Sequence, residues 1–321
     1  MVPSPRVVAA LAALAAPAAL VAFVMLVAFA PRAAAQTPKA WTPPRTPDGQ
    51  PDLRGTWVNF DSTPFERPGA EPPAATLSPG TPGPPGVTTA QINPPSHWTD
   101  HDSPMKARRP SMVVDPADGR VPVMRWAEEQ RAYDLAHIGD HWVHQTPWER
   151  CITRGVPGGM FPAAYNNGYQ ILQTPGFVVI AEEMIHEARV IPLDGRPHVG
   201  AGITQWNGDS RGRWDGNTLV VDTTNFNDKG SIATSAATGR IRGIPQSEAL
   251  HVVERFTPVD ANTIDYQVTV SDPNVYTKPW TVQIPLTRDS KYHVFEYACE
   301  EGNFSTPNIL SGARAAERAT R

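Results

Sequence analysis

The chain has 321 residues, a formal net charge of −4 and 40% hydrophobic residues. The small acidic excess disfavours a strong electrostatic interaction with nucleic acid or an anionic membrane, and the apolar fraction excludes a wholly disordered chain. A small-molecule ligand or substrate is the partner we expect. Many of the 35 prolines lie before residue 100, so the first third differs in composition from the rest.

The first residues have the pattern of a secretory signal peptide, which we assign to residues 1–35. Arg6 precedes an apolar stretch at residues 7–30, and Ala33 to Ala35 then precede Gln36. A basic start, an apolar segment and small residues at the cleavage position are typical of export. We predict cleavage after Ala35 and a periplasmic or secreted protein that has no membrane contact after cleavage. The apolar stretch is about 24 residues long, enough to span a bilayer, so a retained anchor is the alternative.

The chain has two cysteines, Cys151 and Cys299. In an exported protein a disulfide between them is the default expectation. Such a bond would close a loop of about 149 residues, for which chain entropy gives a ceiling of about 5 kcal/mol. The alternative is two separate buried thiols.

Residues 36–110 read as a proline-rich tether and strap that contains one short strand, at residues 56–60. The segment 64–95 has almost no apolar periodicity, so we expect neither helix nor paired strand in it. Residues 111–321 read as the β-rich domain.

In that domain a hairpin is predicted around the turn at 115–120, and a single helix at 124–138. Strands joined by short turns follow, most clearly where apolar and polar residues alternate. The predicted strands are 169–174, 177–186, 188–191, 218–224, 249–257, 263–271, 280–287 and 291–298.

The fold class is therefore all-β: an antiparallel meander closed into a barrel or folded into a sandwich. We favour the barrel. Gly55, Thr56 and Trp57 resemble the Gly-x-Trp that opens lipocalin-type barrels, a signal of three residues.

A wider resemblance covers most of the mature chain and rests on several short runs. The chain resembles an abundant group of exported, functionally uncharacterised bacterial proteins, which implies export and a single domain but no activity. The group pattern has His at position 300, where this chain has Glu300, so no role is carried over to that position. The runs are RTPDGQPDL at 45–53, QTPG at 173–176, EMIH at 183–186, GDSRG and LVVDTT within 206–227, and EYACEEGN at 296–303.

The main candidate site lies on the predicted strand 177–186 and the loop after it. Period-2 alternation puts Glu182 and His186 on one strand face, about 7 Å apart, where they can share a substrate or a water. His and carboxylate groups supply acid–base catalysis, and arginines bind an anionic group. The catalytic candidates are His186, Glu182, His198 and Asp209, and the substrate-binding candidates are Arg196, Arg211 and Trp206.

A structural reading of these residues stays open. Asp194 and Gly195 form a turn pattern like Asp118 and Gly119, and the loop charges can be simple ion pairs. His186 can equally be a hydrogen-bonded structural histidine.

A second pattern, His137, His141 and His144, has spacings of four and three that suit a metal half-site if the helix continues. Gly139 argues that the helix has already ended. We therefore predict no metal and no cofactor, with this triplet as the alternative.

Two functions remain after this reading. The first is a periplasmic or secreted hydrolase or lyase that acts on a small organic or sugar-derived substrate by His and carboxylate chemistry. The second is a lipocalin-like carrier of an apolar small molecule. An enzyme needs His and acids that converge on a pocket, whereas a carrier needs an apolar cup.

Overall fold

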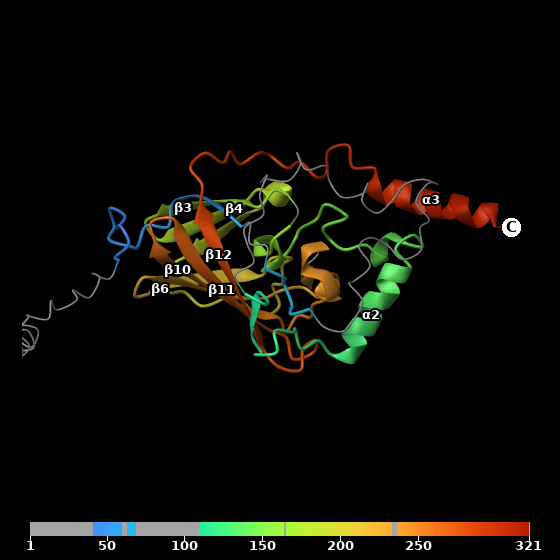
Figure 1. Ribbon diagram of the computed structural model, residues 1–321, viewed down its shortest axis with the longest axis horizontal. Coiled ribbons are helices and arrows are strands. Elements are labelled where there is room, and N and C mark those ends of the chain that lie inside the picture. Colours follow the sequence, from blue (N-terminus) through green and yellow to red (C-terminus); the bar gives the residue numbers. More distant parts are fainter. Residues whose placement is uncertain (1–40, 60–62, 69–108, 164, 233–235, 321) are drawn as a thin grey trace, which may run out of the picture. The chain divides into compact units, whose positions relative to one another are not determined.

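The computed structural model describes residues 41–59, 63–68, 109–163, 165–232 and 236–320. The chain divides into two units, Met1–Trp41 and Thr42–Arg321, and the second unit contains every strand of the described part. Its principal sheet is antiparallel, with nine strands in the order β5-β4-β3-β1-β12-β11-β10-β7-β6 (Figure 1). The fold is thus an all-β, nearly closed barrel, as predicted.

The strands of this sheet have the following bounds: β1 Gly55–Val58, β3 Gly168–Thr174, β4 Phe177–Glu182, β5 Ala188–Pro192, β6 Asp209–Asp215, β7 Thr218–Thr224, β10 His251–Asp260, β11 Thr263–Ser271 and β12 Trp280–Arg288. A short strand β2, Val113–Asp115, pairs with β12 off this path, and β8 (Ser231–Ile232) pairs with β9 (Ile244–Pro245) in a separate sheet.

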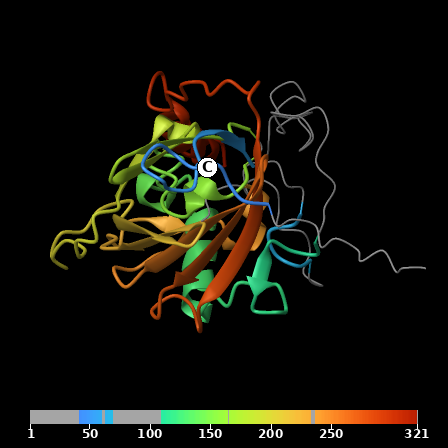
Figure 2. The same ribbon diagram turned by 90° about the vertical axis from the view of Figure 1, so that its left-hand side faces the viewer.

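The three longest strands, β10, β11 and β12, lie side by side in the sheet (Figure 2). Buried and half-buried residues alternate along each of them, and this alternation builds the core. On β11 the buried residues pair with buried residues of both neighbours, so one face of all three strands points inward. Aromatic side chains fill much of the interior; Trp57, Trp280, Phe256 and Tyr266 are all at most 1% exposed. The barrel interior is therefore occupied by side chains.

The barrel closes where β5 approaches β6. A Cβ at Gly212 of β6 would lie 2.8 Å from Ile191 Cγ2 of β5 and 2.6 Å from Leu193 Cδ2. Glycine therefore lets the two edge strands approach closely. No hydrogen-bonded ladder of the described strands joins them.

The short strand predicted at residues 56–60 is present as β1, Gly55–Val58, and belongs to the barrel sheet. The strand β1 lies between β3 and β12, and Leu53 N donates to Gln173 Oε1 on β3 at 2.6 Å. Trp57 Nε1 donates to Leu53 O, and both residues are buried. The barrel therefore includes residues that the composition indicated as a tether. The predicted signal peptide and most of the predicted strap, from residue 69 on, lie outside the described residues.

Three local predictions were wrong. The strand β2 pairs with β12, so no hairpin forms across 115–120; Val123 instead makes an isolated bridge to Tyr276. Residues 291–298 form no strand, because the buried Glu183 carboxylate accepts hydrogen bonds from Tyr292 Oη and Phe295 N. The strand β6 was expected to be a loop.

The described part contains two α-helices, where one was predicted (Figure 1). The helix α2, Arg125–Ala136, matches the predicted helix and lies against β9. The second, α3, is Ser305–Ala319, and it has no buried residue. None of the described helices is both long enough and apolar enough to cross a membrane.

The predicted disulfide is present. Cys151 and Cys299 are bonded, with their Cα atoms 5.4 Å apart. The bond joins segments separated by 148 positions in the sequence. It is compatible with a location outside the cytoplasm.

Candidate functional site

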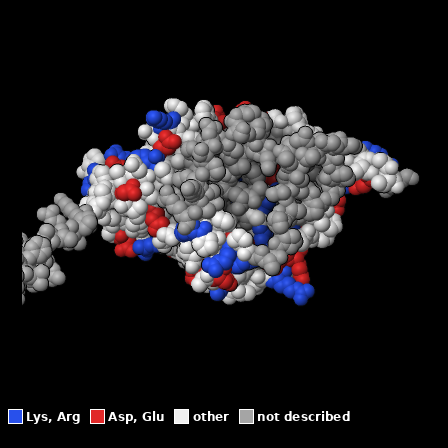
Figure 3. All heavy atoms as spheres, viewed as in Figure 1, with Lys and Arg blue, Asp and Glu red and all other residues white. Residues whose placement is uncertain are grey.

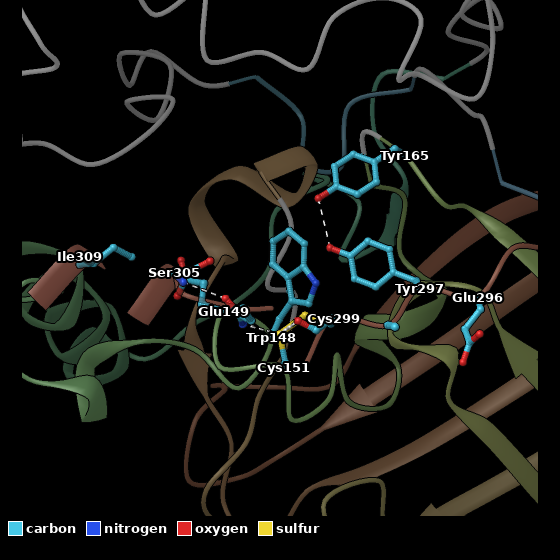
Figure 4. Close-up of a pocket in the computed structure, with 11 residues that line it drawn as sticks. Trp148, Glu149, Cys151, Tyr165, Glu296, Tyr297, Cys299, Ser305 and Ile309 are labelled. Atoms are coloured by element: carbon cyan, nitrogen blue, oxygen red, sulfur yellow. Dashed lines mark hydrogen bonds between the residues drawn. A yellow bond between two sulfur atoms is a disulfide. The ribbon is translucent and has the colours of Figure 1, made fainter. Parts of the chain in front are cut away.

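A pocket of about 490 Å³ surrounds the disulfide, and we call it the tyrosine pocket (Figure 4). Four segments form it: the turn at 146–151, the segment around Tyr165, the segment 296–303 and the first turns of α3. The lining residues are Trp148, Glu149, Cys151, Tyr165, Glu296, Tyr297, Ala298, Cys299, Asn303, Ser305 and Ile309.

Local hydrogen bonds hold the walls in place. Glu149 Oε2 accepts from Thr146 N and Thr146 Oγ1, which fixes the turn that carries Trp148. Glu149 Oε1 also accepts from Arg242 at 2.6 Å. Asn303 Nδ2 donates to Cys151 Sγ at 2.7 Å, across the disulfide. The Glu149 carboxylate is thus already neutralised by a partner.

Tyr165 and Tyr297 face each other across the pocket. Their hydroxyl oxygens are 3.5 Å apart and point toward one another (Figure 4). Burial raises the pKa of Tyr297, and its hydrogen bond with Tyr165 raises it further. The Tyr297 hydroxyl therefore keeps its proton at neutral pH, and a tyrosine hydroxyl of this kind can donate a hydrogen bond to a ligand.

Behind this pair lies Arg154, which is only 1% exposed. Its Cζ atom is 5.9 Å from the centroid of the Trp148 ring, and its Nη2 donates to Phe161 O. Its Nε atom is buried and has no hydrogen-bond partner. Among the described residues, no carboxylate lies within 4.0 Å of this guanidinium.

A second group of charges is buried inside the barrel. Arg189 donates from Nη1 and Nη2 to both oxygens of Glu254, at 2.7 and 2.9 Å. Tyr266 Oη donates to Glu254 Oε1. Glu182 Oε1 is 3.8 Å from Arg189 Nε. Burial raises the pKa of Glu182 to about 7, although Arg189 lowers it in part.

The structure places Glu182 and His186 in different surroundings. The strand β4 ends at Glu182, which points into the barrel, and a 3₁₀ turn follows over Met184–His186. Ile185 and His186 have φ angles of 62° and 43°, in the left-handed region. The prediction that His186 continues the strand is wrong for this reason. His186 instead lies at the surface, with Nε2 3.3 Å from Glu300 Oε1.

Three of the other candidates lie together on the outer side of the barrel. His198 Nδ1 is 3.0 Å from Asp209 Oδ2, and Arg211 Nη2 is 3.0 Å from Asp209 Oδ1. Two residues that the sequence did not single out complete this cluster. Asp222 lies 2.9 Å from His198 Nε2 and 2.9 Å from His251 Nε2.

The strand pairing explains this outer cluster. Arg211 of β6 is opposite Asp222 of β7, and the next strand, β10, begins at His251. A sequence pattern that marked β6 as a strand would have predicted that Arg211 and Asp222 are neighbours. In the described part, no hydrogen bond or ion pair joins His186 to this cluster.

The remaining candidates are separate from one another. Arg196 bonds to Asp194 within its own turn, which agrees with the structural reading of that motif. Trp206 is half-buried in the loop before β6. His137 caps the end of α2, while His144 Nδ1 is 2.8 Å from Asp134 Oδ1.

The described residues contain no group of three or more His, Cys, Asp and Glu side chains arranged to hold a metal ion. The helix ends before the triplet: the rings of His137 and His144 still lie 6.0 Å apart between centroids, whereas the His141 side chain caps the 3₁₀ turn Trp142–His144.

The tyrosine pocket itself was missed. Trp148, Tyr165 and Tyr297 have no shared sequence motif, and the signal that could have found them is the cysteine pair. A disulfide brings together whatever flanks both cysteines, and Trp148 and Tyr297 are each within three positions of one.

Comparisons with known proteins return no match. No family model, no curated protein and no solved structure matches the chain.

Proposed function

We propose that this protein binds a small organic molecule in the tyrosine pocket, outside the cytoplasm. The observation that carries the proposal is the pocket itself. Its volume of about 490 Å³ falls within the range of small-molecule sites, about 300–1,000 Å³. It combines an indole ring with two hydroxyl donors, the mixture of apolar surface and a few polar groups that such sites have.

Two further features support an extracytoplasmic ligand-binding role. The signal-like amino terminus favours export, and the disulfide that lines the pocket suits an oxidising compartment. In a lipocalin-like carrier the ligand would occupy the barrel itself. Here the interior holds Trp57, Trp280 and the Arg189–Glu254 pair, so the tyrosine pocket is the better location for a ligand.

A ligand screen by thermal shift, followed by calorimetry, tests the proposal. Ile309 lines the pocket from α3 and is 36% exposed, so Ile309→Trp should fill the pocket without disturbing the core. We expect this variant to abolish binding of the hits. The matched control is Ile203→Trp in an exposed loop, which should bind normally. Hits that bind both variants equally would show that the ligand site is elsewhere.

A hydrolase or lyase activity is the second candidate, and the His186–Glu300 pair favours it. His186 is the only candidate catalytic residue whose ion-pair partner, Glu300, belongs to the segment 296–303 that lines the pocket. A carboxylate beside an imidazole is a common acid–base arrangement.

The test is turnover of each hit by the wild type and by His186→Gln. If the pair is catalytic, turnover should fall by about 10²–10⁴-fold. Because the side chain is 38% exposed, the melting temperature should hardly change. Unchanged turnover by the variant would show that His186 is not the catalytic group, and no turnover of any hit would leave binding alone as the function.

A further inference from the structure

Arg154 does not line the tyrosine pocket, but it lies close to three residues that do, Trp148, Tyr165 and Tyr297, and no carboxylate of the described residues forms an ion pair with its guanidinium. The guanidinium is fully buried, and its Nε atom has no partner. Burial lowers the pKa of Arg154, and Tyr169, Glu182, Tyr165 and Tyr297 partly offset this effect. A buried cation without an adjacent anion is costly, and an anion bound nearby reduces that cost.

The two tyrosines present hydroxyl groups to the pocket and also lie near this cation. Tyr165 and Tyr297 both line the pocket, and both interact electrostatically with Arg154. Trp148 also lines the pocket, and its ring lies over the guanidinium. An anion at the two hydroxyls would therefore receive two hydrogen bonds and the attraction of a buried charge, which solvent screens only weakly.

The acidic residues of the pocket do not oppose this arrangement. Glu149 is paired with Arg242 and Thr146. Glu296 is exposed, and its carboxylate is directed away from the two tyrosine hydroxyls (Figure 4). The charge of Glu296 is therefore screened by water, whereas that of the buried Arg154 is screened only weakly.

We propose that the ligand of the tyrosine pocket is a small organic acid whose carboxylate accepts one hydrogen bond from each of the Tyr165 and Tyr297 hydroxyls, in place of the bond that these hydroxyls make with each other, and whose body packs on Trp148. The two hydroxyl donors match the two oxygens of a carboxylate, and the single charge of Arg154 matches its single negative charge. This inference rests on the proposed function and specifies the ligand class for the same pocket. Arg154 is a positioning residue here, because it acts through the tyrosines and Trp148.

The experiment compares matched pairs that differ only in the acid group. The probes are benzoate with benzamide and glucuronate with glucuronamide, measured by calorimetry at pH 7 and low salt. We expect at least one carboxylate to bind 10-fold or more tightly than its amide. The double variant Tyr165→Phe with Tyr297→Phe should remove this preference, and the exposed Tyr133→Phe is the control that should keep it.

The two proposals fail in different ways. If an amide binds as tightly as its acid, and Ile309→Trp abolishes the binding of both, the pocket binds ligands but does not prefer acids. If the acid preference survives in the double tyrosine variant, the carboxylate is not held by the hydroxyls. If neither member of either pair binds, the inference is overturned, whereas a hit from the wider screen that Ile309→Trp abolishes would still support the pocket.

Discussion

Arg189 and Glu254 form a bidentate ion pair inside the barrel, with N–O distances of 2.7 and 2.9 Å. Their strands, β5 and β10, are not neighbours in the sheet, since β5 ends one side of the strand order and β10 is third from the other. Arg189 is 6% exposed and Glu254 is fully buried. Each charge therefore depends on the other across the barrel interior.

Removing one partner of this pair should be strongly destabilising. Arg189→Met or Glu254→Gln should each lower the free energy of unfolding by about 3–5 kcal/mol, because one buried charge loses its partner. The double variant Arg189→Met with Glu254→Leu should lose less free energy of unfolding than the two single variants lose together. Urea denaturation measures all three. Arg255→Ala, which breaks the exposed pair with Asp215, is the control and should cost less than about 1 kcal/mol. Additive losses in the double variant would contradict the coupling.

Glu182 should make stability fall as pH rises. Its pKa is about 7 in the folded state, against an ordinary value of 4.5 for a glutamate in water, so between these two pH values the folded state retains a proton that the unfolded chain has released. The stabilisation is fully present below pH 4.5 and is lost as pH rises through 7. As pH rises, the free energy of unfolding of the wild type should fall by about 3 kcal/mol more than that of Glu182→Gln. Denaturation curves of both proteins between pH 4.5 and 8 measure it, and parallel pH profiles would show that the carboxyl ionises normally.

Loss of the disulfide should weaken both the fold and the pocket. Cys151→Ala with Cys299→Ala should lower the free energy of unfolding by up to about 5 kcal/mol, because a long loop of the unfolded chain is no longer closed. Thiol titration of the denatured, unreduced wild type should detect no free thiol. Ligand affinity of the variant, measured by calorimetry below its melting temperature, should also fall, since the bond joins two walls of the pocket. Two free thiols per wild-type chain would contradict the bond.

Asp209 and Asp222 should differ in their contribution to stability. Asp209 is 12% exposed and accepts hydrogen bonds from His198 and Val199 N while it pairs with Arg211. Asp209→Asn should therefore cost about 1–3 kcal/mol. Asp222 is 44% exposed, so Asp222→Asn should cost less than about 1 kcal/mol. Thermal unfolding of both variants gives the comparison. Equal losses of stability in the two variants would indicate that the two carboxylates stabilise His198 to the same extent.

Basic and acidic side chains are mixed on the described part of one face of the molecule (Figure 3). On the face shown in Figure 3, basic and acidic side chains of the described residues lie close together. This mixture accords with the small net charge of the chain. Recognition by charge is therefore more plausible at a local site, such as the tyrosine pocket, than over that face.

The sequence by itself determined the strands whose signal is local. Alternation of apolar and polar residues predicted β11 with its observed bounds and β12 to within one residue, because a half-buried strand needs one apolar face. The turn signal at Asp215 and Gly216 preceded the prediction of β7, whose bounds are also as observed. Two cysteines predicted the disulfide, because only one pairing exists. The residues of α2 carried their own helix propensity. By contrast, β6 has the sequence DSRGRWD, in which apolar residues do not alternate, so the sequence did not predict this strand or its pairing with β7.

Only the tertiary structure decided which distant residues meet. His186 leaves the strand because Ile185 and His186 adopt left-handed backbone angles, which no residue pattern at those positions requires. Glu182, Arg189 and Glu254 form one buried group only because the barrel closes, and a charged residue in a strand gives no sign of its partner beforehand. Trp148, Tyr165 and Tyr297 form a pocket because the disulfide and Glu183 hold the carboxy-terminal segment against loops more than 100 positions earlier. Contacts at such separations depend on the path of the whole chain, and local sequence encodes that path only weakly.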